Sequence, residues 1–325
     1  MKIAILGCER SWSIKKIEKT AIRRGHKVTF IRDRDLVVKI DPKLEVSING
    51  ITDLKNFDVL LRRRIVNGYL QSLIAARYMR RQGKLTIPER IDVGQALDDK
   101  MTQAVKLHSA GVRHIPVFQA LTRKNAIRIL RMVDYPIIIK GIVGTKGRRV
   151  FKLNTRSAAL KVIKKYRYAN VLIQEFVNIK HDRRVFVVGK KVLGVMKRII
   201  PKGEYRANIA QGAKARKAVL SKELKNIALK AAGTLNYDIA GVDVIYRKGK
   251  PAVLEVNSSP GLKGFSHATG INVAGEIVIY LEKKYKFHQR RLKKQNHLRN
   301  KEKRVEKEKK GWWNKNISQI FGAGQ

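Results

Sequence analysis

The chain has 325 residues, of which 44% are hydrophobic and 30% are charged. This apolar content excludes a disordered chain, and 24 Gly, 7 Pro and 1 Cys exclude collagen-like and disulfide-rich folds. A single cysteine cannot form an internal disulfide, and no segment approaches the ~20 apolar residues of a membrane helix. We therefore expect a cytoplasmic protein with no membrane-spanning segment.

The net charge is strongly positive, with 72 Lys and Arg against 25 Asp and Glu, or +47. Such a surplus favours polyanionic partners: nucleic acid, ribosomes, nucleotides or acidic peptides. Residues 286–325 hold 13 Lys and Arg and 3 Glu, a net +10, and the remaining +37 is spread over the rest of the chain. A charge this diffuse is equally typical of an organism whose proteins are all basic, so both interpretations stay open.

The first 95 residues alternate strands and helices, which predicts a small parallel α/β domain. The strands are expected at 2–7, 27–31 and 59–61, and the helices at 13–24 and 68–81, which end at Gly25 and Gly83. Gly7 is followed by Cys8-Glu9-Arg10-Ser11-Trp12 and not by a GxGxxG turn, so a dinucleotide-binding fingerprint is absent.

After a linker from Ile87, residues 96–285 show a mixed pattern of strands and helices. The expected helices are 99–108 (capped by Asp98 or Asp99), 124–133, 157–166, 221–235 and 273–285. The expected strands are 136–140, 150–153 and 171–176, with a meander over 183–198 and a hairpin over 239–257. Residues 286–325 are polar and charged up to Trp312-Trp313, which predicts a basic tail, either helical or disordered.

The hairpin over 239–257 carries the most informative pattern. A three-residue loop centred on Gly249 pairs residue 247 with 251, and therefore Asp243 with Glu255. One face then holds Val242, Val244, Tyr246, Ala252, Leu254 and Val256, and the other holds Asp243, Glu255 and Asn257. Two carboxylates and an amide oxygen suit Mg²⁺. A solvated face with salt bridges to the many basic residues is the alternative.

A second pattern follows the strand at 136–140, which ends in Lys140. The next segment is Gly141-Ile142-Val143-Gly144-Thr145-Lys146-Gly147-Arg148-Arg149, whose glycines let the backbone approach an anion closely. It is no Walker A loop, because the GK[ST] ending and the following helix are missing. Taken alone, a segment of this kind is more commonly a plain glycine-rich hairpin loop.

Polar groups interrupt three further segments. They are Gln174-Glu175 in the apolar strand 171–177, Asp182 and Arg184 on one strand face, and Tyr205-Arg206-Ala207-Asn208 before Ala210-Gln211-Gly212-Ala213. Each alone fits an exposed strand edge, but packing does not explain all of them together.

In this order and spacing the segments resemble the ATP-grasp superfamily, and in detail the RimK-type glutamate ligases. The resemblance covers residues 96–285. Its most specific part is Ile239-Ala240-Gly241-Val242-Asp243, followed by Leu254-Glu255-Val256-Asn257-Ser258-Ser259-Pro260-Gly261-Leu262 and Ala268-Thr269-Gly270-Ile271. It implies an α/β chain: an N-terminal α/β domain (1–95), a two-lobed ATP-grasp domain with mixed and antiparallel sheets (96–285), and the basic tail (286–325).

The resemblance also implies roles for single residues. Contacts to the nucleotide are expected from Lys100, Lys140, the loop residues Gly144, Thr145, Lys146 and Gly147, the adenine-binding Glu175 and Phe176, the ribose-binding Asp182, and Arg206. Arg206 and Asn208 would be the catalytic residues near the γ-phosphate and the acyl phosphate. The ligands of Mg²⁺ or Mn²⁺ would be Asp243, Glu255 and Asn257.

The implied activity is an ATP-dependent carboxylate–amine ligase that forms an amide through an acyl phosphate. It would add an amino acid such as glutamate to a protein or small-molecule acceptor. ATP, amino-acid and amine or carboxylate substrates are the expected partners. An acidic protein or a ribosome is expected at the basic tail, and formation of a homo-oligomer stays open.

Two departures from the family pattern concern the acceptor. Arg148-Arg149 replace smaller residues, and Ala210-Gln211-Gly212-Ala213 replaces His-Arg-Gly-Gly. Two alternatives to a glutamate ligase also remain, the first of which is favoured by the basic tail and the overall charge. One is a nucleic-acid- or ribosome-binding protein on an inactive ATP-grasp scaffold, and the other is an ATP-grasp ligase of small-molecule biosynthesis.

Overall fold

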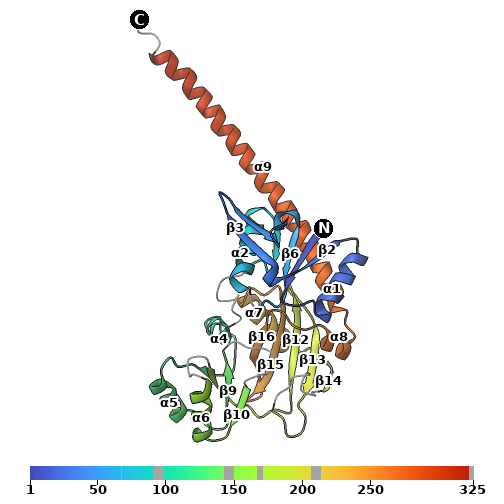
Figure 1. The fold of residues 1–325 in the computed structure, drawn as a ribbon, viewed down its shortest axis with the longest axis vertical. Coiled ribbons are helices and arrows are strands. Elements are labelled where there is room, and N and C mark those ends of the chain that lie inside the picture. The colour runs from blue at the N-terminus through green and yellow to red at the C-terminus, as the bar shows by residue number, and fades with distance from the viewer. Residues whose placement is uncertain (67, 91–98, 143–149, 167–170, 206–213, 322–325) are drawn as a thin grey trace. The chain divides into compact units, whose positions relative to one another are not determined.

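The computed structural model describes residues 1–66, 68–90, 99–142, 150–166, 171–205 and 214–321 (Figure 1). The chain divides into two compact units, Met1–Tyr280 and Leu281–Gln325. Within the described ranges, no helix combines the length and the apolar character that crossing a membrane requires.

The N-terminal sheet is parallel, as the sequence predicts, with the strand order β2-β1-β6-β7. Its strands are β1 (Lys2–Gly7), β2 (Lys27–Arg32), β6 (Val59–Arg62) and β7 (Leu85–Ile87). The helices α1 (Trp12–Arg23) and α2 (Tyr69–Arg81) are followed by Gly25 and Gly83, both with positive φ. Strand β7 lies where the sequence suggested the start of a linker, so the sheet has one strand more than predicted.

A small antiparallel sheet, absent from the prediction, is inserted between β2 and β6. Its strands are β3 (Leu36–Ile40), β4 (Leu44–Ile48) and β5 (Thr52–Asp53), flanked by the 3₁₀ turns η1 (Asp33–Asp35) and η2 (Leu54–Asn56). Val46 and Leu54 of this insertion pack into the core that α2 and the N-terminal sheet share.

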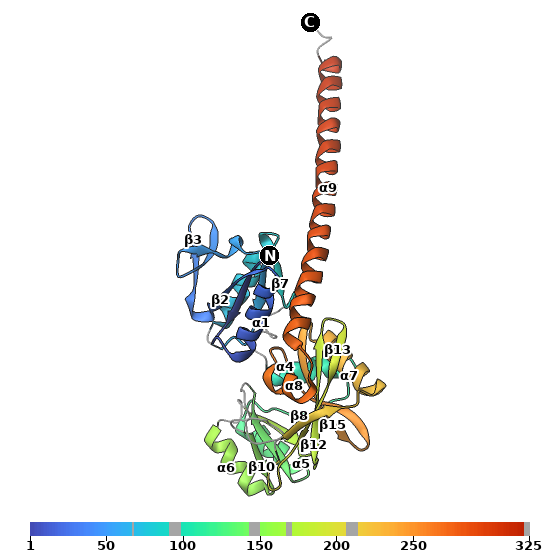
Figure 2. The ribbon, with the colours of Figure 1, turned by 90° about the vertical axis from the view of Figure 1, so that its right-hand side faces the viewer.

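A four-stranded sheet, β10-β9-β11-β8, forms the next layer. Its strands are β8 (Val117–Phe118), β9 (Ile137–Gly141), β10 (Val150–Leu153) and β11 (Val171–Glu175), and neighbouring strands pair antiparallel. The helices α5 (Arg123–Met132) and α6 (Arg156–Tyr166) cover one face (Figures 1 and 2), where Leu130 and Ile163 pack against Ile139 and Ile173. The other face carries Lys140, Leu172 and Gln174, which are also buried.

A five-stranded antiparallel sheet, β14-β13-β12-β15-β16, completes the larger unit. Its strands are β12 (His181–Val188), β13 (Lys191–Ile199), β14 (Lys214–Ala218), β15 (Ile239–Arg247) and β16 (Lys250–Asn257). The helices α4 (Lys100–Ser109) and α7 (Lys222–Thr234) contribute Leu107 and Leu224 to its core. The short helix α8 (Lys263–Thr269) follows β16.

The turn of the β15–β16 hairpin differs from the prediction. Arg247 pairs with Lys250, so the loop has two residues, Lys248 and Gly249, both with positive φ as in a type I′ turn. The register then shifts between Asp243 and Val244, where β16 holds one extra residue, Leu254. The bulge compensates for the shorter loop, and the predicted pairing of Asp243 with Glu255 is therefore confirmed.

The same bulge corrects the predicted faces of the hairpin. Ala252 and Leu254 were expected beside Val242 and Val244, but they pack with Ile115 and Ile245 instead. Val242 and Val244 lie in the core beneath α7. Leu254 is thereby moved to the face that carries Asp243, Glu255 and Asn257.

The last helix, α9 (Val273–Phe321), begins in the first unit and makes up the described part of the second. Of the two alternatives for the tail, the structure shows the helical one for residues 286–321. Its i,i+4 ion pairs, Arg304 with Glu308 and Lys310 with Glu306, are solvent-exposed, as are Trp312 and Trp313.

Candidate active site

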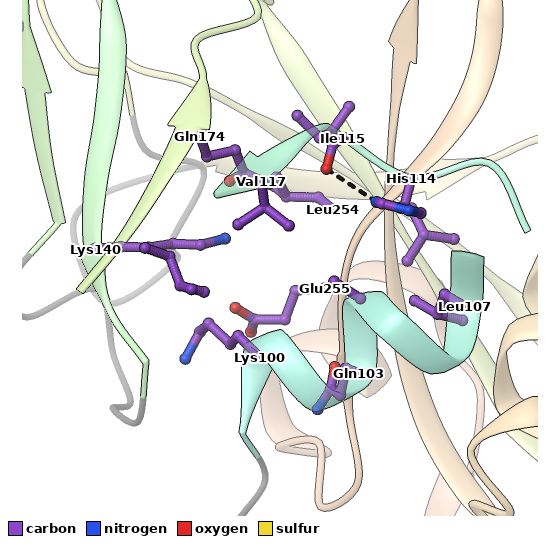
Figure 3. Close-up of a pocket in the computed structure, with 13 residues that line it drawn as sticks. Lys100, Gln103, Leu107, His114, Ile115, Val117, Lys140, Gln174, Leu254 and Glu255 are labelled. Atoms are coloured by element: carbon purple, nitrogen blue, oxygen red, sulfur yellow. Dashed lines mark hydrogen bonds between the residues drawn. The ribbon is translucent and has the colours of Figure 1, made fainter. Parts of the chain in front are cut away.

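A cavity lies between the face of β9 and β11 opposite α5 and α6 and the hairpin strand β16, and α4 closes one side of it (Figure 3). Lys140 enters it from β9, Gln174 from β11, Lys100 from α4, and Leu254 and Glu255 from β16. Asp99, one of the two caps that the sequence predicts, accepts a hydrogen bond from the Met101 backbone N–H at 2.8 Å and so fixes the helix turn that carries Lys100.

Lys140 is a buried cation in this cavity, with 8% of its surface exposed. The pKa of its ammonium is lowered to about 8, mainly by burial; Glu255 raises this pKa and nearby Lys100 lowers it. Within the described ranges its ammonium has no hydrogen bond and no ion pair, and it points into the cavity (Figure 3). A buried charge normally has a partner, so this position suits a bound anion.

Glu255 and Asn257 have oxygen atoms available to a ligand. The Glu255 carboxylate forms no hydrogen bond or ion pair with the rest of the described chain. Asn257 donates its Nδ2 to the Gly241 carbonyl at 3.4 Å, which leaves its Oδ1 unoccupied by that contact. A carboxylate and an amide oxygen at the end of one strand are ligands that Mg²⁺ accepts.

Asp243 lies in a buried cluster with Asp182, Arg184 and Arg198. Arg184 donates to both Asp243 oxygens at 2.6 Å, and Arg198 lies 2.9 Å from Asp243 Oδ2. Arg198 also donates both Nε and Nη2 to Asp182. Although burial opposes ionisation, the two arginines lower the pKa of Asp243, whereas burial and the nearby Asp243 raise the pKa of Asp182.

The cluster shows that the oxygens of two predicted ligand-binding carboxylates are already engaged. Asp182, expected at the ribose, is 2% exposed and holds Arg198. Asp243, expected at the metal, is 4% exposed and holds both arginines. Among the described residues, no group of three or more His, Cys, Asp or Glu side chains is arranged to hold a metal ion.

The two residues expected at the adenine lie at the end of β11. Glu175 forms an ion pair with Arg247 at 2.8 Å, and the Lys152 ammonium lies 4.2 Å from the centre of the Phe176 ring. Gln174, one position earlier, lines the cavity, and so does Leu172, whereas Ile173 points into the core under α6. Strand alternation could have indicated Gln174, because it shares the face of Leu172.

The remaining predicted residues, Gly144, Thr145, Lys146, Gly147, Arg206 and Asn208, lie outside the described residues. Sequence reasoning also missed Gln103, whose Oε1 accepts the Val256 backbone N–H at 3.3 Å and so ties α4 to β16. Nothing local marks Gln103, since a single glutamine on a helix is a common surface residue.

The chain is similar in sequence to known ligases. The RimK-like ATP-grasp domain model matches residues 98–281. A probable alpha-L-glutamate ligase of Legionella pneumophila is 35% identical over 88% of this chain and 97% of the relative. The ribosomal protein bS6–L-glutamate ligase of Escherichia coli is 30% identical over 87% of this chain and 96% of the relative.

Solved structures of ATP-grasp ligases share the fold. The ligase PsnB, in complex with a phosphomimetic precursor variant, Mg and ADP, superposes with a TM-score of 0.68 at 17% identity, over 87% of this chain and 98% of that one. The D-cycloserine synthetase DcsG gives 0.64 at 16% identity, over 88% and 100%. The chain therefore belongs to the RimK-like ATP-grasp family and is an ATP-dependent ligase that forms amide bonds.

Proposed function

We propose that this ligase adds an amino acid, glutamate in the first instance, to a protein acceptor. The observation that carries the nucleotide part is Lys140, a buried ammonium with no hydrogen bond or ion pair among the described residues, which points into the cavity of Figure 3. Glutamate and a protein acceptor are supported by the names of relatives that match almost their whole length.

In this proposal Lys140 and Lys100 bind the phosphates of ATP, with Gly144, Thr145, Lys146 and Gly147 of the glycine-rich segment over them. Gln174, Glu175 and Phe176 border the adenine. Asp182 is the candidate for the ribose hydroxyls, provided that it exchanges its contact with Arg198 for one with the sugar. Arg206 and Asn208 are proposed at the reacting phosphate.

Glu255 and Asn257 fit a magnesium ion, because both have oxygens that no described side chain occupies. Asp243 can join them only when Arg184 or Arg198 releases one of its oxygens. A bound Mg²⁺, or Mn²⁺ in its place, neutralises charge on the phosphate oxygens during transfer.

The chemistry has two steps. A substrate carboxylate oxygen attacks the γ-phosphorus of ATP, the bond to the β-phosphate oxygen breaks, and acyl phosphate and ADP result. The amine of the second substrate then attacks the acyl carbon, inorganic phosphate leaves, and the amine loses a proton as the amide forms. Negative charge builds on the transferring group, so the chain's contribution is cationic and positional.

The basic segment 286–325 is proposed to recruit an anionic macromolecule, an acidic protein or a ribosome, at a distance from the cavity. The Legionella pneumophila and Escherichia coli relatives leave about an eighth of the chain unmatched, a share comparable to this segment. The division into 1–95, 96–285 and 286–325 and a cytoplasmic location, where ATP is plentiful, belong to the same proposal.

The test is Glu255→Gln against Glu45→Gln, which removes the same charge from an exposed position of β4. Metal-dependent ATP turnover should be lost only in the first variant, because only Glu255 faces the cavity. Mass spectrometry of acceptors incubated with ATP, Mg²⁺ and mixed amino acids then identifies what is joined. Full turnover by Glu255→Gln would contradict the metal assignment, and a wild-type chain without turnover would favour the inactive-scaffold alternative.

A further inference from the structure

A second cavity, of about 310 Å³, lies between α1 and the segment from α8 to the start of α9. It shares no lining residue with the cavity of Figure 3. Helix α1 forms one wall with Trp12, Lys16, Thr20 and Arg23, and the other wall is built around Ser266, His267 and Asn272. Both walls belong to the first compact unit.

The α1 wall is a regular stripe along one helix face. Its four residues are spaced by four, four and three positions, which places them in line. At 1.5 Å per residue the stripe is about 16 Å long, the length of about five residues of extended chain. Lys16 and Arg23 lie about 10 Å apart along the axis, the reach of three extended residues.

This groove carries positive charge that no described residue neutralises. Lys16 and Arg23 are exposed and take part in no ion pair within the described ranges, and no acidic side chain lines the groove. Glu18, the acid of α1, is buried on another face and binds Arg10 at 2.9 Å. Trp12 lies edge-on to His267, with ring centres 6.2 Å apart, and adds apolar surface at one end.

The Trp12 end is fixed to the loop that leaves the proposed metal-binding strand. Leu262, five residues after Asn257, lines the groove and donates its backbone N–H to the Ser13 hydroxyl at 3.0 Å. Arg63 holds the same loop by donating to the Pro260 carbonyl at 2.7 Å. A chain bound in the groove is therefore tethered beside the segment that ends the active-site hairpin.

We infer that this groove is an exosite for an acidic peptide segment of the acceptor. Lys16 and Arg23 pair with carboxylates about three residues apart, and Trp12 covers the apolar part of the bound chain. The identification of the peptide as part of the acceptor rests on the proposed function, and so does the effect of added glutamate, whereas binding of an acidic peptide requires neither ATP nor turnover. Each glutamate added to an acceptor gives one more carboxylate, so the groove also favours a product already extended.

The experiment measures the fluorescence anisotropy of a labelled octaglutamate peptide with the full-length protein, without ATP. Lys16→Glu/Arg23→Glu is compared with Lys15→Glu/Lys19→Glu, which makes the same charge change at exposed α1 positions outside the groove. The groove variant should bind at least tenfold more weakly, and the control variant less than twofold. Equal losses in the two variants would overturn the exosite and leave only general charge attraction.

A milder pair of variants and a fluorescence measurement complete the experiment. If the charge reversal impairs folding, Lys16→Gln/Arg23→Gln replaces it and should still weaken binding more than Lys15→Gln/Lys19→Gln. In a Trp312→Phe/Trp313→Phe background Trp12 is the remaining tryptophan, and its emission should change with peptide but not with an octaglutamine control. A groove that binds a single-stranded oligonucleotide and ignores the acidic peptide would refute the proposal.

Discussion

Replacing Lys140 with methionine should stabilise the nucleotide-free protein and at the same time remove its affinity for ATP. Methionine has nearly the length of lysine and no charge, so it fills the same space at the end of β9. The wild-type chain keeps an ammonium there at 8% exposure, without a hydrogen bond or ion pair within the described residues. In the proposed function, the phosphates of ATP compensate for the burial of that charge.

The size of the effect follows from the shift of the Lys140 pKa, from 10.5 to about 8 through burial. Such a shift corresponds to about 3 kcal/mol of free energy lost from the folded state at pH 7, where the lysine must be charged. Because the folded-state pKa lies below the unfolded one, the loss is complete below pH 8. The loss of folding free energy becomes smaller as the pH rises from about 8 towards 10.5. In this range Lys140 is deprotonated in the folded chain but still protonated in the unfolded chain.

The assay is urea unfolding of wild type and Lys140→Met at pH 7 and pH 9.5, with and without ATP·Mg²⁺, together with nucleotide affinity by calorimetry. We expect the variant to be the more stable at pH 7 without nucleotide, by up to about 3 kcal/mol, and the difference to narrow at pH 9.5. ATP should stabilise only the wild type. A variant that is less stable at pH 7, or that binds ATP normally, would refute the assignment of Lys140.

Three further outcomes are expected. Arg198→Leu leaves Asp182 and Asp243 buried without one of their partners and should lower the free energy of unfolding by about 3–5 kcal/mol in urea titrations; a loss under 1 kcal/mol would contradict the cluster. Gly189→Ala brings a Cβ at positive φ into overlap with the edge of the Tyr280 ring and should lower the melting temperature clearly more than Gly203→Ala, where φ is positive but the space is open; equal shifts would exclude the overlap. Deletion of 286–325 should spare ATP turnover and reduce the salt-sensitive part of co-sedimentation with ribosomes; an unchanged salt dependence would dismiss the segment as a recruitment element.

Local patterns predicted most of the fold, because its helices and strands follow their periodicity and their glycine stops. The parallel N-terminal sheet, helix α4 with its Asp99 cap and strand β10 agree with the sequence. The β3–β5 insertion was not predicted, since its strands are short and half-exposed and lack a continuous apolar face. Strand β14, with the pattern Lys-Ala-Arg-Lys-Ala, was missed because its position comes from pairing with β13 and not from its own side chains.

The pairing of two candidate site residues, Asp243 and Glu255, could be predicted from the sequence, whereas the arginines that bind Asp243 could not. A three-residue loop without a bulge and a two-residue loop with one extra residue in β16 both pair Asp243 with Glu255. The predicted loop was wrong, but the predicted pair was therefore right. The arginine partners could not be predicted in this way. Arg198 of β13 pairs with Asp182 on the neighbouring β12 and reaches Asp243 on β15 beyond it, and this second contact depends on the pairing of β12 with β15, which is distant in sequence.

The two arginines differ in a way that bears on how a metal could reach Asp243. The four charges of the cluster cancel, so a divalent cation beside Asp243 would be repelled by both guanidinium groups unless one of them moves. Arg198 has 4% of its side chain exposed and two aspartate partners, whereas Arg184 has 17% exposed and one. Arg184 is therefore the group that can leave at lower cost, since water or a phosphate can take over its hydrogen bonds. A metal held by Glu255 and Asn257 would then complete its shell with Asp243 only after Arg184 turns away, while Arg198 keeps the carboxylate in place.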